Sequence, residues 1–474
     1  MKKLVALLLV GAMAISTVAC GGGGSSAPAQ EPAAPAEEAA PAEEAPAEAE
    51  APAEEEAEAP AAEGESAGGE AASSITLWTY PIGKWGDEAT VKSLTDAFTA
   101  ESGITVNVEF LAYADGDDKV NTAITAGQAP DLIMEGPERL VANWGANGYM
   151  VDLSDMLDDT DRSEIQEAPL TACTAPGGEV YEYPLVMTAH CMAVNLNAFK
   201  EAGADQYLDL ETHTWTTENF IKAVEALYAH YNDTVAAVYC AGQGGDQGTR
   251  ALVNNLYGGS YTDAGHTAYT WNSPENVKAL EQLKSMNGIA FDASLAGGDE
   301  IAKFYQGILK MAFCWNIAQQ LDPNAAGTGA GLTVTGDEIE FMSFPSETGE
   351  SKLQGGIWGF GIFDNGDAGR IEASKQFIKY MADSAATVDA VKAANYFAVR
   401  SAAEGTDLSA IWSDNEIMNE YQVLMPQLGD YYQVTPGWAG QRTAWWTMLQ
   451  KIGEGMDVTE ALTQYEGEAN AAME

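Results

Sequence analysis

The chain has 474 residues, of which 71 are Asp or Glu and 22 are Lys or Arg, giving a formal net charge of −49 at pH 7. Nucleic acids and anionic bilayers are negatively charged themselves, so this charge argues against either as a binding partner. The five cysteines include no C-x-x-C pair, which excludes the common zinc and thioredoxin patterns. Four widely spaced cysteines leave both two disulfides and buried free thiols open: Cys173, Cys191, Cys240 and Cys314.

The N-terminal segment has the layout of an export signal. A positively charged start precedes an aliphatic stretch, Leu4 to Val10, that is too short for a stable membrane span, and small residues lead to Cys20. This arrangement resembles a bacterial lipoprotein signal, which implies that residues 1–19 are removed and that the cysteine is diacylated, although Thr17 stands where Leu is usual. The alternative is an ordinary signal peptide with an incidental cysteine. Both interpretations place the mature protein outside the cytoplasmic membrane. The lipoprotein interpretation also anchors it by lipid to the extracytoplasmic face of that membrane.

Residues 20–74 form a long acidic segment made almost wholly of Ala, Glu, Pro, Gly and Ser. It contains 14 Glu and no Lys, Arg or aromatic residue. Such a composition cannot bury enough apolar surface to offset the entropy of an ordered chain. We therefore predict a disordered tether between Cys20 and the folded part.

The remaining 400 residues exceed what one hydrophobic core usually serves, so two domains are expected. Apolar periodicity first predicts alternating strands and helices at 75–80, 88–101, 104–110, 119–126 and 131–134. This alternation is typical of a parallel sheet between layers of helices.

The alternation resumes further along and indicates a second α/β lobe. Its predicted elements are strands at 189–196, 235–240 and 309–315 and helices at 216–231 and 274–286. Beyond residue 369 the pattern is mostly helical, with apolar faces at 371–381, 386–394, 441–452 and 458–469.

Several short motifs follow one another in a recognisable order. The segment 122–133, TAITAGQAPDLI, resembles a signature of extracellular solute-binding proteins of the maltose-binding-like cluster, which serve carbohydrate ABC importers. Further segments similar to that family lie at 148–153, 181–184, 194–195, 214–220, 307–313, 399–400 and 453–462. The resemblance covers essentially all of residues 75–474.

The resemblance implies a fold and a function. The fold is α/β and two-lobed, like periplasmic binding proteins of type II, with three crossings between an N-lobe (75–187 and 362–399) and a C-lobe (188–361 and 400–474). The function is capture of a mono- or oligosaccharide by hinge closure and its delivery to the permease subunits of an ABC importer. Neither enzymatic activity nor a cofactor is implied.

In the N-lobe, four residues are candidates for ligand contact. Open α/β sheets bind ligands beyond the carboxyl ends of their strands, and sugars need aromatic rings and paired donors and acceptors. Tyr80 and Trp85 flank the loop after the first strand, which in the family lines the cleft. Glu138 and Arg139 follow the third strand, where relatives carry an acidic-basic pair that binds hydroxyl groups. The alternative for this pair is a solvated surface location.

In the C-lobe, the candidates for ligand contact lie next to the crossings, at strand ends or near a helix start. Thr188 and His190 follow the first crossing, and a strand ends on Trp315, expected to expose its ring, with Asn316 beside it. A buried, hydrogen-bonded role for the histidine and a core position for Trp358 remain open. The other candidates, near a helix start or a return strand, are Gln319, Trp358, Trp438 and Arg442.

Other functions find little support. The chain contains no G-x-S-x-G, P-loop or H-E-x-x-H motif, and no two of its four histidines have metal-ligand spacing. Residues 115–118 and 364–367 are Asp-rich, but neither completes an EF-hand loop, so no metal is predicted. Two alternatives to a sugar importer component remain: a binding protein of the same fold for a cation such as a polyamine, and a secreted carbohydrate-active enzyme or adhesin.

Overall fold

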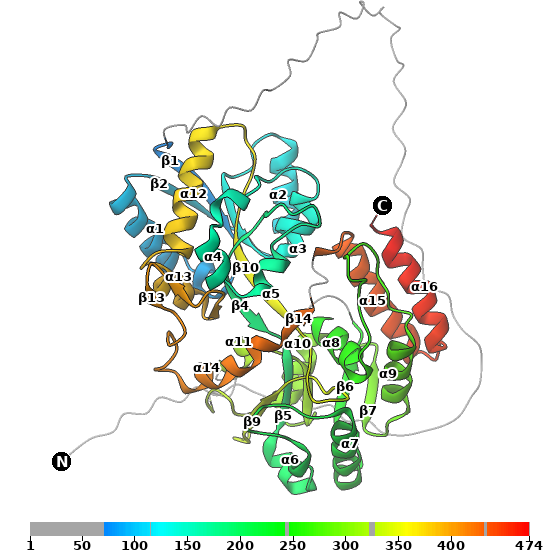
Figure 1. Ribbon diagram of the computed structural model, residues 1–474. Coiled ribbons are helices and arrows are strands. Elements are labelled where there is room, and N and C mark those ends of the chain that lie inside the picture. Colours follow the sequence, from blue (N-terminus) through cyan, green and yellow to red (C-terminus); the bar gives the residue numbers. More distant parts are fainter. Residues whose placement is uncertain (1–70, 114, 242–245, 322–327, 431–433, 474) are drawn as a thin grey trace, which may run out of the picture. The chain divides into compact units, whose positions relative to one another are not determined.

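A computed structural model describes residues 71–113, 115–241, 246–321, 328–430 and 434–473 (Figure 1). The predicted signal, Cys20 and most of the predicted tether lie outside the described residues. The described residues belong to one compact unit, Ser66–Glu474. Ala72 donates a backbone hydrogen bond to Gly369, and the first strand opens at Ser74, so ordered structure begins slightly before residue 75.

The first sheet has seven strands in the order β11-β4-β10-β3-β1-β2, with β14 paired to β10. Strands β1 (Ser74–Thr79), β2 (Thr105–Phe110) and β3 (Leu132–Glu135) are parallel, as predicted. Helices α1 (Glu88–Ser102) and α2 (Gly116–Thr125) connect them, α1 being capped by the Asp87 carboxylate. The antiparallel members are β4 (Tyr183–Ala189), β10 (Leu353–Ile362) and β11 (Phe397–Ala398), while β14 is Leu428–Asp430.

Two smaller sheets and the short pair β12–β13 form the rest of the strand framework among the described residues. Strand β5 (Cys191–Asn195) lies between β8 (Met311–Trp315) and β9 (Ile339–Met342), antiparallel to both. Strand β6 (Ala236–Tyr239) is parallel to β7 (Ile289–Asp292). Their helices are α6 (Leu196–Ala202), α7 (Thr217–Tyr231), α8 (Asp246–Tyr257), α9 (Pro274–Ser285), α10 (Gly297–Tyr305) and α11 (Ile317–Leu321).

The chain passes between the first sheet and the smaller sheets three times: from β4 to β5, from β9 to β10, and after β11. Strand β10 approaches β4 so closely that a Cβ atom on Gly359 would lie 2.1 Å from the carbonyl oxygen of Tyr183, which explains the glycines of this strand. Through its pairing with β3 and β4, segment 355–362 belongs to the first sheet, although the predicted boundary assigned most of it to the C-lobe.

The predicted C-terminal helices are all present. They are α12 (Ala368–Ala382), α13 (Thr387–Ala394), α15 (Trp438–Gly453) and α16 (Val458–Ala471). Helix α15 begins three residues earlier than predicted, so Trp438 lies in its first turn, and the helix packs on β7 and α16. The short elements are η1 (Gly83–Gly86), α3 (Pro137–Arg139), η2 (Leu140–Gly145), η3 (Ser154–Met156), α4 (Asp159–Glu164), α5 (Glu167–Ala172), η4 (Asp205–Tyr207), β12 (Ala402–Ala403), β13 (Thr406–Asp407), α14 (Glu416–Tyr421) and η5 (Gln422–Gln427).

Of the two alternatives for the four cysteines, disulfides or free thiols, the structure shows free thiols. Cys173, Cys191 and Cys240 are buried and Cys314 is half-buried, and all four are free. Burial raises the pKa of the Cys191 thiol to about 12, which keeps it protonated and unreactive.

Candidate functional site

The guanidinium of Arg139 lies at the centre of a cluster of carboxylates. Strand β3 ends at Glu135, and the short α3 that follows turns Arg139 back over it. Arg139 Nε donates to Asp117 Oδ1 and Nη1 donates to Glu135 Oε1, each at 2.7 Å, while Glu138 Oε1 lies 3.7 Å from Nη1. Burial raises the pKa of the Glu135 carboxyl to about 8, against the opposing charge of Arg139. The cluster therefore holds one cation among three carboxyl groups.

Three aromatic rings surround the same guanidinium. Its Cζ atom lies 5.2 Å from the ring centre of Tyr80, 5.7 Å from that of Tyr113 and 4.9 Å from that of Trp438, within the range of cation–π attraction. Tyr80 and Tyr113 stack on each other with ring centres 5.1 Å apart, and the Tyr80 hydroxyl donates to Asp117. Since α3 follows the first sheet and α15 packs on β7, the contact between Arg139 and Trp438 joins the two sheet systems directly.

A second group of charged residues supports Trp438: Arg442 from the same helix, and Asp246 and Arg250 from α8. Arg442, one turn along α15, places its Cζ atom 4.5 Å from the centre of the Trp438 ring. Its Nη2 donates to Asp246 Oδ1 at 2.6 Å, and Asp246 also pairs with the fully buried Arg250. Burial opposes ionisation of Asp246, but the two arginines outweigh it and hold its pKa well below the usual range. Arg442 is thus a fixed support for the ring.

A cavity of about 720 Å³ opens beside these residues. One side carries carboxylates and amides of α2, α3 and the segment after them, and the other is formed by the start of α15. Carboxylate and amide groups pair with hydroxyl hydrogens and oxygens, so this lining suits a polyhydroxylated molecule. The polar and aromatic side chains that line it are Asp117, Asp118, Asn121, Glu138, Arg139, Asn143, Asn147 and Trp438.

His190 lies near the supporting charges, at the crossing from β4 to β5. Its backbone N–H donates to the carbonyl of Gln354, and its side chain is half-buried. Burial, reinforced by Arg250 and opposed by Asp246, lowers the pKa of His190 to about 4. The imidazole is therefore neutral at neutral pH and offers one donor and one acceptor.

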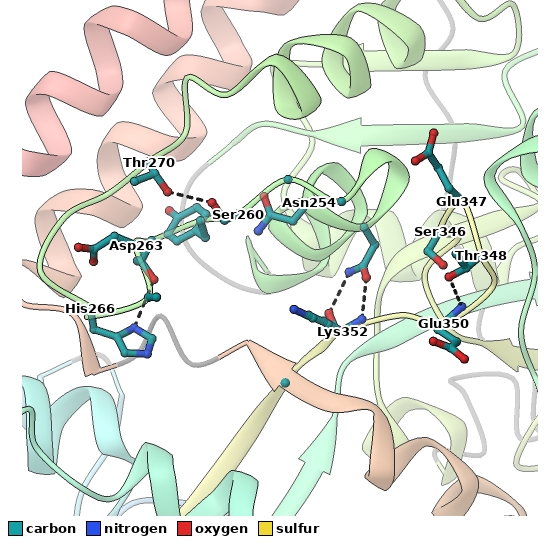
Figure 2. A pocket seen from close by; sticks show the side chains of 17 residues that line it. Asn254, Ser260, Asp263, His266, Thr270, Ser346, Glu347, Thr348, Glu350 and Lys352 are labelled. Atoms are coloured by element: carbon teal, nitrogen blue, oxygen red, sulfur yellow. Dashed lines mark hydrogen bonds between the residues drawn. The ribbon is translucent and has the colours of Figure 1, made fainter.

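A second cavity of about 660 Å³ lies entirely among residues of 254–429 (Figure 2). Its walls are the end of α8 and the loops 258–270 and 346–352. Asn255 exchanges two hydrogen bonds with the backbone of Lys352, and the hydroxyl groups of Ser260 and Thr270 bond to each other. None of the residues predicted for ligand contact lines this cavity.

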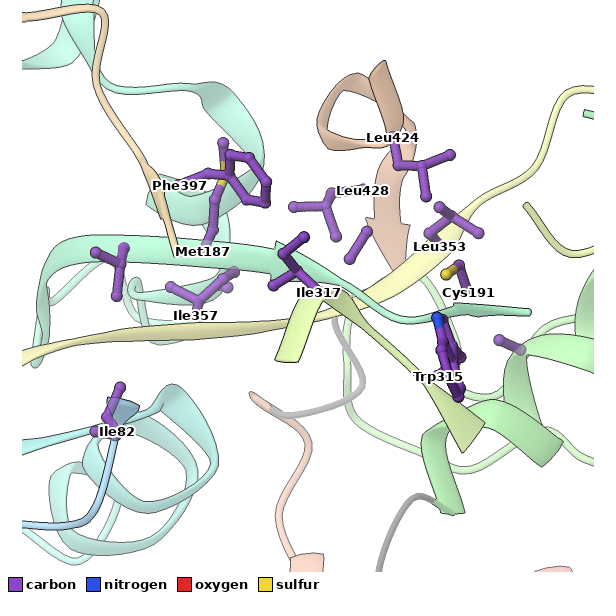
Figure 3. Packing of buried hydrophobic residues seen from close by; sticks show 14 of the residues in the cluster. Ile82, Met187, Cys191, Trp315, Ile317, Leu353, Ile357, Phe397, Leu424 and Leu428 are labelled. Carbon is purple, nitrogen blue, oxygen red and sulfur yellow. The ribbon is translucent and has the colours of Figure 1, made fainter. Parts of the chain in front are cut away.

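Four predicted contact residues are buried, and for these the structure corrects the expectation. Trp315 is 1% exposed, not open to solvent as predicted, and belongs to a cluster of buried apolar side chains (Figure 3). Its ring packs on Phe304 and Tyr305, and its Nε1 donates to Gln320. Trp85 packs edge-on against Phe360 in the core of the first sheet. Four of the twelve predicted side chains therefore have no exposed surface to offer: Tyr80, Trp85, Thr188 and Trp315.

Four further predicted residues are half-buried and are not among the residues described as contacting Arg139: His190, Asn316, Gln319 and Trp358. Asn316 and Gln319 satisfy each other locally, since the Asn316 N–H donates to the Gln319 side chain. Trp358 stacks on Tyr396 with ring centres 4.7 Å apart. The predicted residues that the structure brings together are thus Glu138, Arg139, Trp438 and Arg442, along with the buried Tyr80.

Sequence reasoning missed several members of the cluster. Asp117 belongs to the Asp-rich segment 115–118, which was considered as a metal-binding loop and not as part of a ligand site, yet it binds Arg139. Tyr113 follows β2 just as Tyr80 follows β1, so the rule about strand ends would have found it. Asp246 gave no signal, because it lies 196 residues from its partner Arg442.

Two comparisons with known proteins bear on this site. The model of the family described as bacterial extracellular solute-binding protein matches residues 83–388. The structure is similar to the GacH receptor of Streptomyces glaucescens, solved unliganded and with acarbose, at 17% identity and TM-score 0.64, covering 85% of this chain and 99% of that one. A cyclic α-maltosyl-1,6-maltose binding protein from Arthrobacter globiformis gives 18% identity and TM-score 0.66, with coverage of 84% and 98%.

A third similar structure is a solute-binding protein of an ABC transporter from Agrobacterium radiobacter, solved with ribitol, at 20% identity and TM-score 0.63, covering 85% of this chain and 99% of that one. No curated protein sequence matches the chain. The fold is therefore the two-lobed α/β fold of periplasmic binding proteins, with three crossings, as predicted.

No helix among the described residues has both the length and the apolar character that crossing a bilayer requires. Within the same residues, no three His, Cys, Asp or Glu side chains gather in a way that could hold a metal ion.

Proposed function

Because the chain belongs to the family of bacterial extracellular solute-binding proteins, we propose that it captures a mono- or oligosaccharide by hinge closure and delivers it to an ABC permease. The observation that carries the proposal is the contact of Arg139 with Trp438, which joins the two lobes beside a cavity lined by carboxylates and amides. Relatives of the same fold bind acarbose and ribitol, both polyhydroxylated molecules, which supports a sugar or polyol as the ligand.

The proposed ligand contacts are the predicted residues that line the cavity of about 720 Å³, together with the half-buried ones. Glu138 and Arg139 from the N-lobe would face Trp438, supported by Arg442, from the C-lobe. His190, Asn316, Gln319 and Trp358 are half-buried and retain surface for further contacts. A ligand that touches both lobes only in the closed form shifts the equilibrium between open and closed states toward closure.

The proposal includes anchoring by lipid at Cys20, followed by the tether. This segment lies outside the described residues, so the support is the sequence pattern of residues 1–20. A tethered domain on the extracytoplasmic face would present the loaded, closed form to the permease. Replacement of Cys20 by Ser should release the protein from the membrane fraction, and a serine variant that still incorporates labelled lipid would contradict the anchor.

The test of the sugar proposal is a titration of the full mature chain, carrying Cys20→Ser for solubility, with a panel of mono- and oligosaccharides. Calorimetry and tryptophan fluorescence should detect binding of at least one of them, together with a rise in melting temperature. Absence of any response to sugars would refute the proposal. Turnover of a bound glycan into products would point instead to an enzyme.

A second candidate ligand is a cation such as a polyamine. Three carboxyl groups and three rings already enclose the Arg139 guanidinium, and Asp117, Asp118 and Glu138 line the adjoining cavity. These groups would attract an ammonium group equally well. Spermidine therefore belongs in the same titration, and binding of spermidine without any sugar would select this alternative.

A further inference from the structure

The geometry points to Tyr113 as the ring on which the ligand's sugar stacks, an inference that rests on the proposed function. A pyranose stacks through its C–H face, so the partner ring must have a face open to the cleft. The inference therefore turns on which aromatic ring near the Arg139 cluster is still accessible.

The other candidate rings are buried or packed against other side chains. Tyr80, Trp85 and Trp315 are buried. The ring of Trp438 carries the guanidinium groups of both Arg139 and Arg442, and the ring of Trp358 is stacked on Tyr396. Tyr113 also stacks on Tyr80 and lies 5.7 Å from the Arg139 guanidinium, but it is 51% exposed, which makes it the most exposed of the described rings around Arg139.

The position of Tyr113 fits the architecture of the sheet. It follows β2 as Tyr80 follows β1, and the two strands are parallel neighbours, so both tyrosines emerge at the carboxyl edge where such sheets bind ligands. Stacking on Tyr80 holds the Tyr113 ring, and the Tyr80 hydroxyl is itself fixed by Asp117. The ring is therefore preorganised, which lowers the entropic cost of binding.

The surroundings of Tyr113 are polar. Although half of the residue is exposed, burial raises the pKa of its hydroxyl, and the charge of Glu135 raises it further while that of Arg139 lowers it. Glu138 and Arg139 are close enough to meet hydroxyl groups of a sugar on that ring.

Four variants of the full mature chain with Cys20→Ser test this role against a merely structural one. Tyr113→Phe keeps the ring, Tyr113→Leu keeps apolar volume without a ring, and Tyr113→Ala removes both. Tyr207→Ala is the control, a half-exposed tyrosine at η4 beside α7. Each is titrated with the tightest-binding sugar of the panel, and its melting temperature is measured without ligand.

We expect Leu and Ala at position 113 to weaken binding by about 10- to 100-fold, as truncation of a stacking aromatic does, and Phe to stay within about threefold of wild type. The control should bind like wild type. Wild-type affinity in the Leu and Ala variants would overturn the inference, as would an equal loss in the Phe variant, which would assign the effect to the hydroxyl. A wild-type protein that binds no sugar would overturn the proposed function, and this inference with it.

Discussion

Two cavities of similar volume, about 720 and 660 Å³, differ in which parts of the chain build them. The first is bounded by the N-lobe segment around Arg139 and by Trp438 of α15, whereas the second is built from residues 254–429 alone (Figure 2). Trp438, the Arg139 guanidinium and carboxylate and amide side chains line the first. The second is lined by Tyr261, His266 and hydroxyl, amide and carboxylate groups, among them the bonded pair Ser260 and Thr270. Volume alone therefore does not identify the ligand site.

The difference has a mechanistic reason. Hinge closure transmits the presence of ligand only if the ligand contacts both lobes, because a ligand held by one lobe binds the open and closed forms equally and shifts nothing. Of the two cavities, only the first is lined by both lobes and so meets that condition. The predictions below separate the cavities by changing one and leaving the other.

The largest effect on binding is expected from Arg139→Ala. Removing the guanidinium leaves Glu135, 1% exposed, without its hydrogen-bond partner and breaks the contact with Trp438. Because the pKa of Glu135 is already raised to about 8, this carboxyl becomes neutral when the guanidinium is gone, so the free energy of unfolding should fall by about 1–3 kcal/mol, the cost of an unsatisfied buried polar group. Sugar affinity should fall at least 100-fold. Denaturant titration and calorimetry measure the two effects. Lys352→Ala, an exposed residue at the second cavity, should change neither, and equal losses in both variants would erase the distinction.

Trp315→Ala and Trp438→Ala should separate stability from binding. Trp315 is 1% exposed, so its truncation should cost about 3–5 kcal/mol of unfolding free energy while folded molecules bind sugar normally. Trp438 is half-buried at the start of α15, so its truncation should weaken binding about 10- to 100-fold at a smaller cost in stability. Affinities corrected for the fraction of folded molecules separate a loss of binding from a loss of stability. A binding defect in folded molecules of the Trp315 variant would mean that this ring contacts the ligand.

Asn255→Ala should affect the second cavity without affecting ligand. It removes two hydrogen bonds to the backbone of Lys352, at 2.9 and 2.7 Å, so the free energy of unfolding should fall by about 1–3 kcal/mol. Affinity for the sugar should remain within twofold of wild type. A tenfold loss of affinity would place ligand in the second cavity.

The smallest effect concerns pH and His190. Its folded pKa of about 4 lies below the usual 6.5, so the unfolded chain binds more protons between these values, and stability contributed by the neutral imidazole is lost as pH falls through that window. The difference in unfolding free energy between wild type and His190→Asn should therefore shrink from pH 7 to pH 4. Equilibrium denaturation across that range measures it, and a constant difference would refute the shift.

Much of the fold could be predicted from apolar periodicity, and its limits have a physical cause. The elements from β1 to β3 were predicted with their parallel pairing, because each has a clear apolar face. Helix α8 was missed because its buried residues include Asp246, Arg250 and Asn254, polar side chains that blur the helical pattern. Burial of paired charges is invisible to a method that reads apolar spacing.

The Arg139 cluster, the candidate site, was anticipated in part. Glu138 and Arg139 were proposed from their position after β3 and Trp438 from its position near a helix start, and these residues lie together. Trp315 was assigned to the cleft although it points into the core, because spacing along a strand does not say which ring faces outward. The missing partners of Trp438 and Arg442 come from distant segments, and only the folded chain brings them together.

The central claim is that ligand binds between the lobes at Arg139 and Trp438. Hydrogen–deuterium exchange of the full mature chain, measured with and without the tightest-binding sugar, tests it most directly. We expect slower exchange on both sides of the first cavity, in residues 113–139 and in the start of α15, with no change in 258–270 and 346–352. Protection confined to the loops of the second cavity would contradict the account.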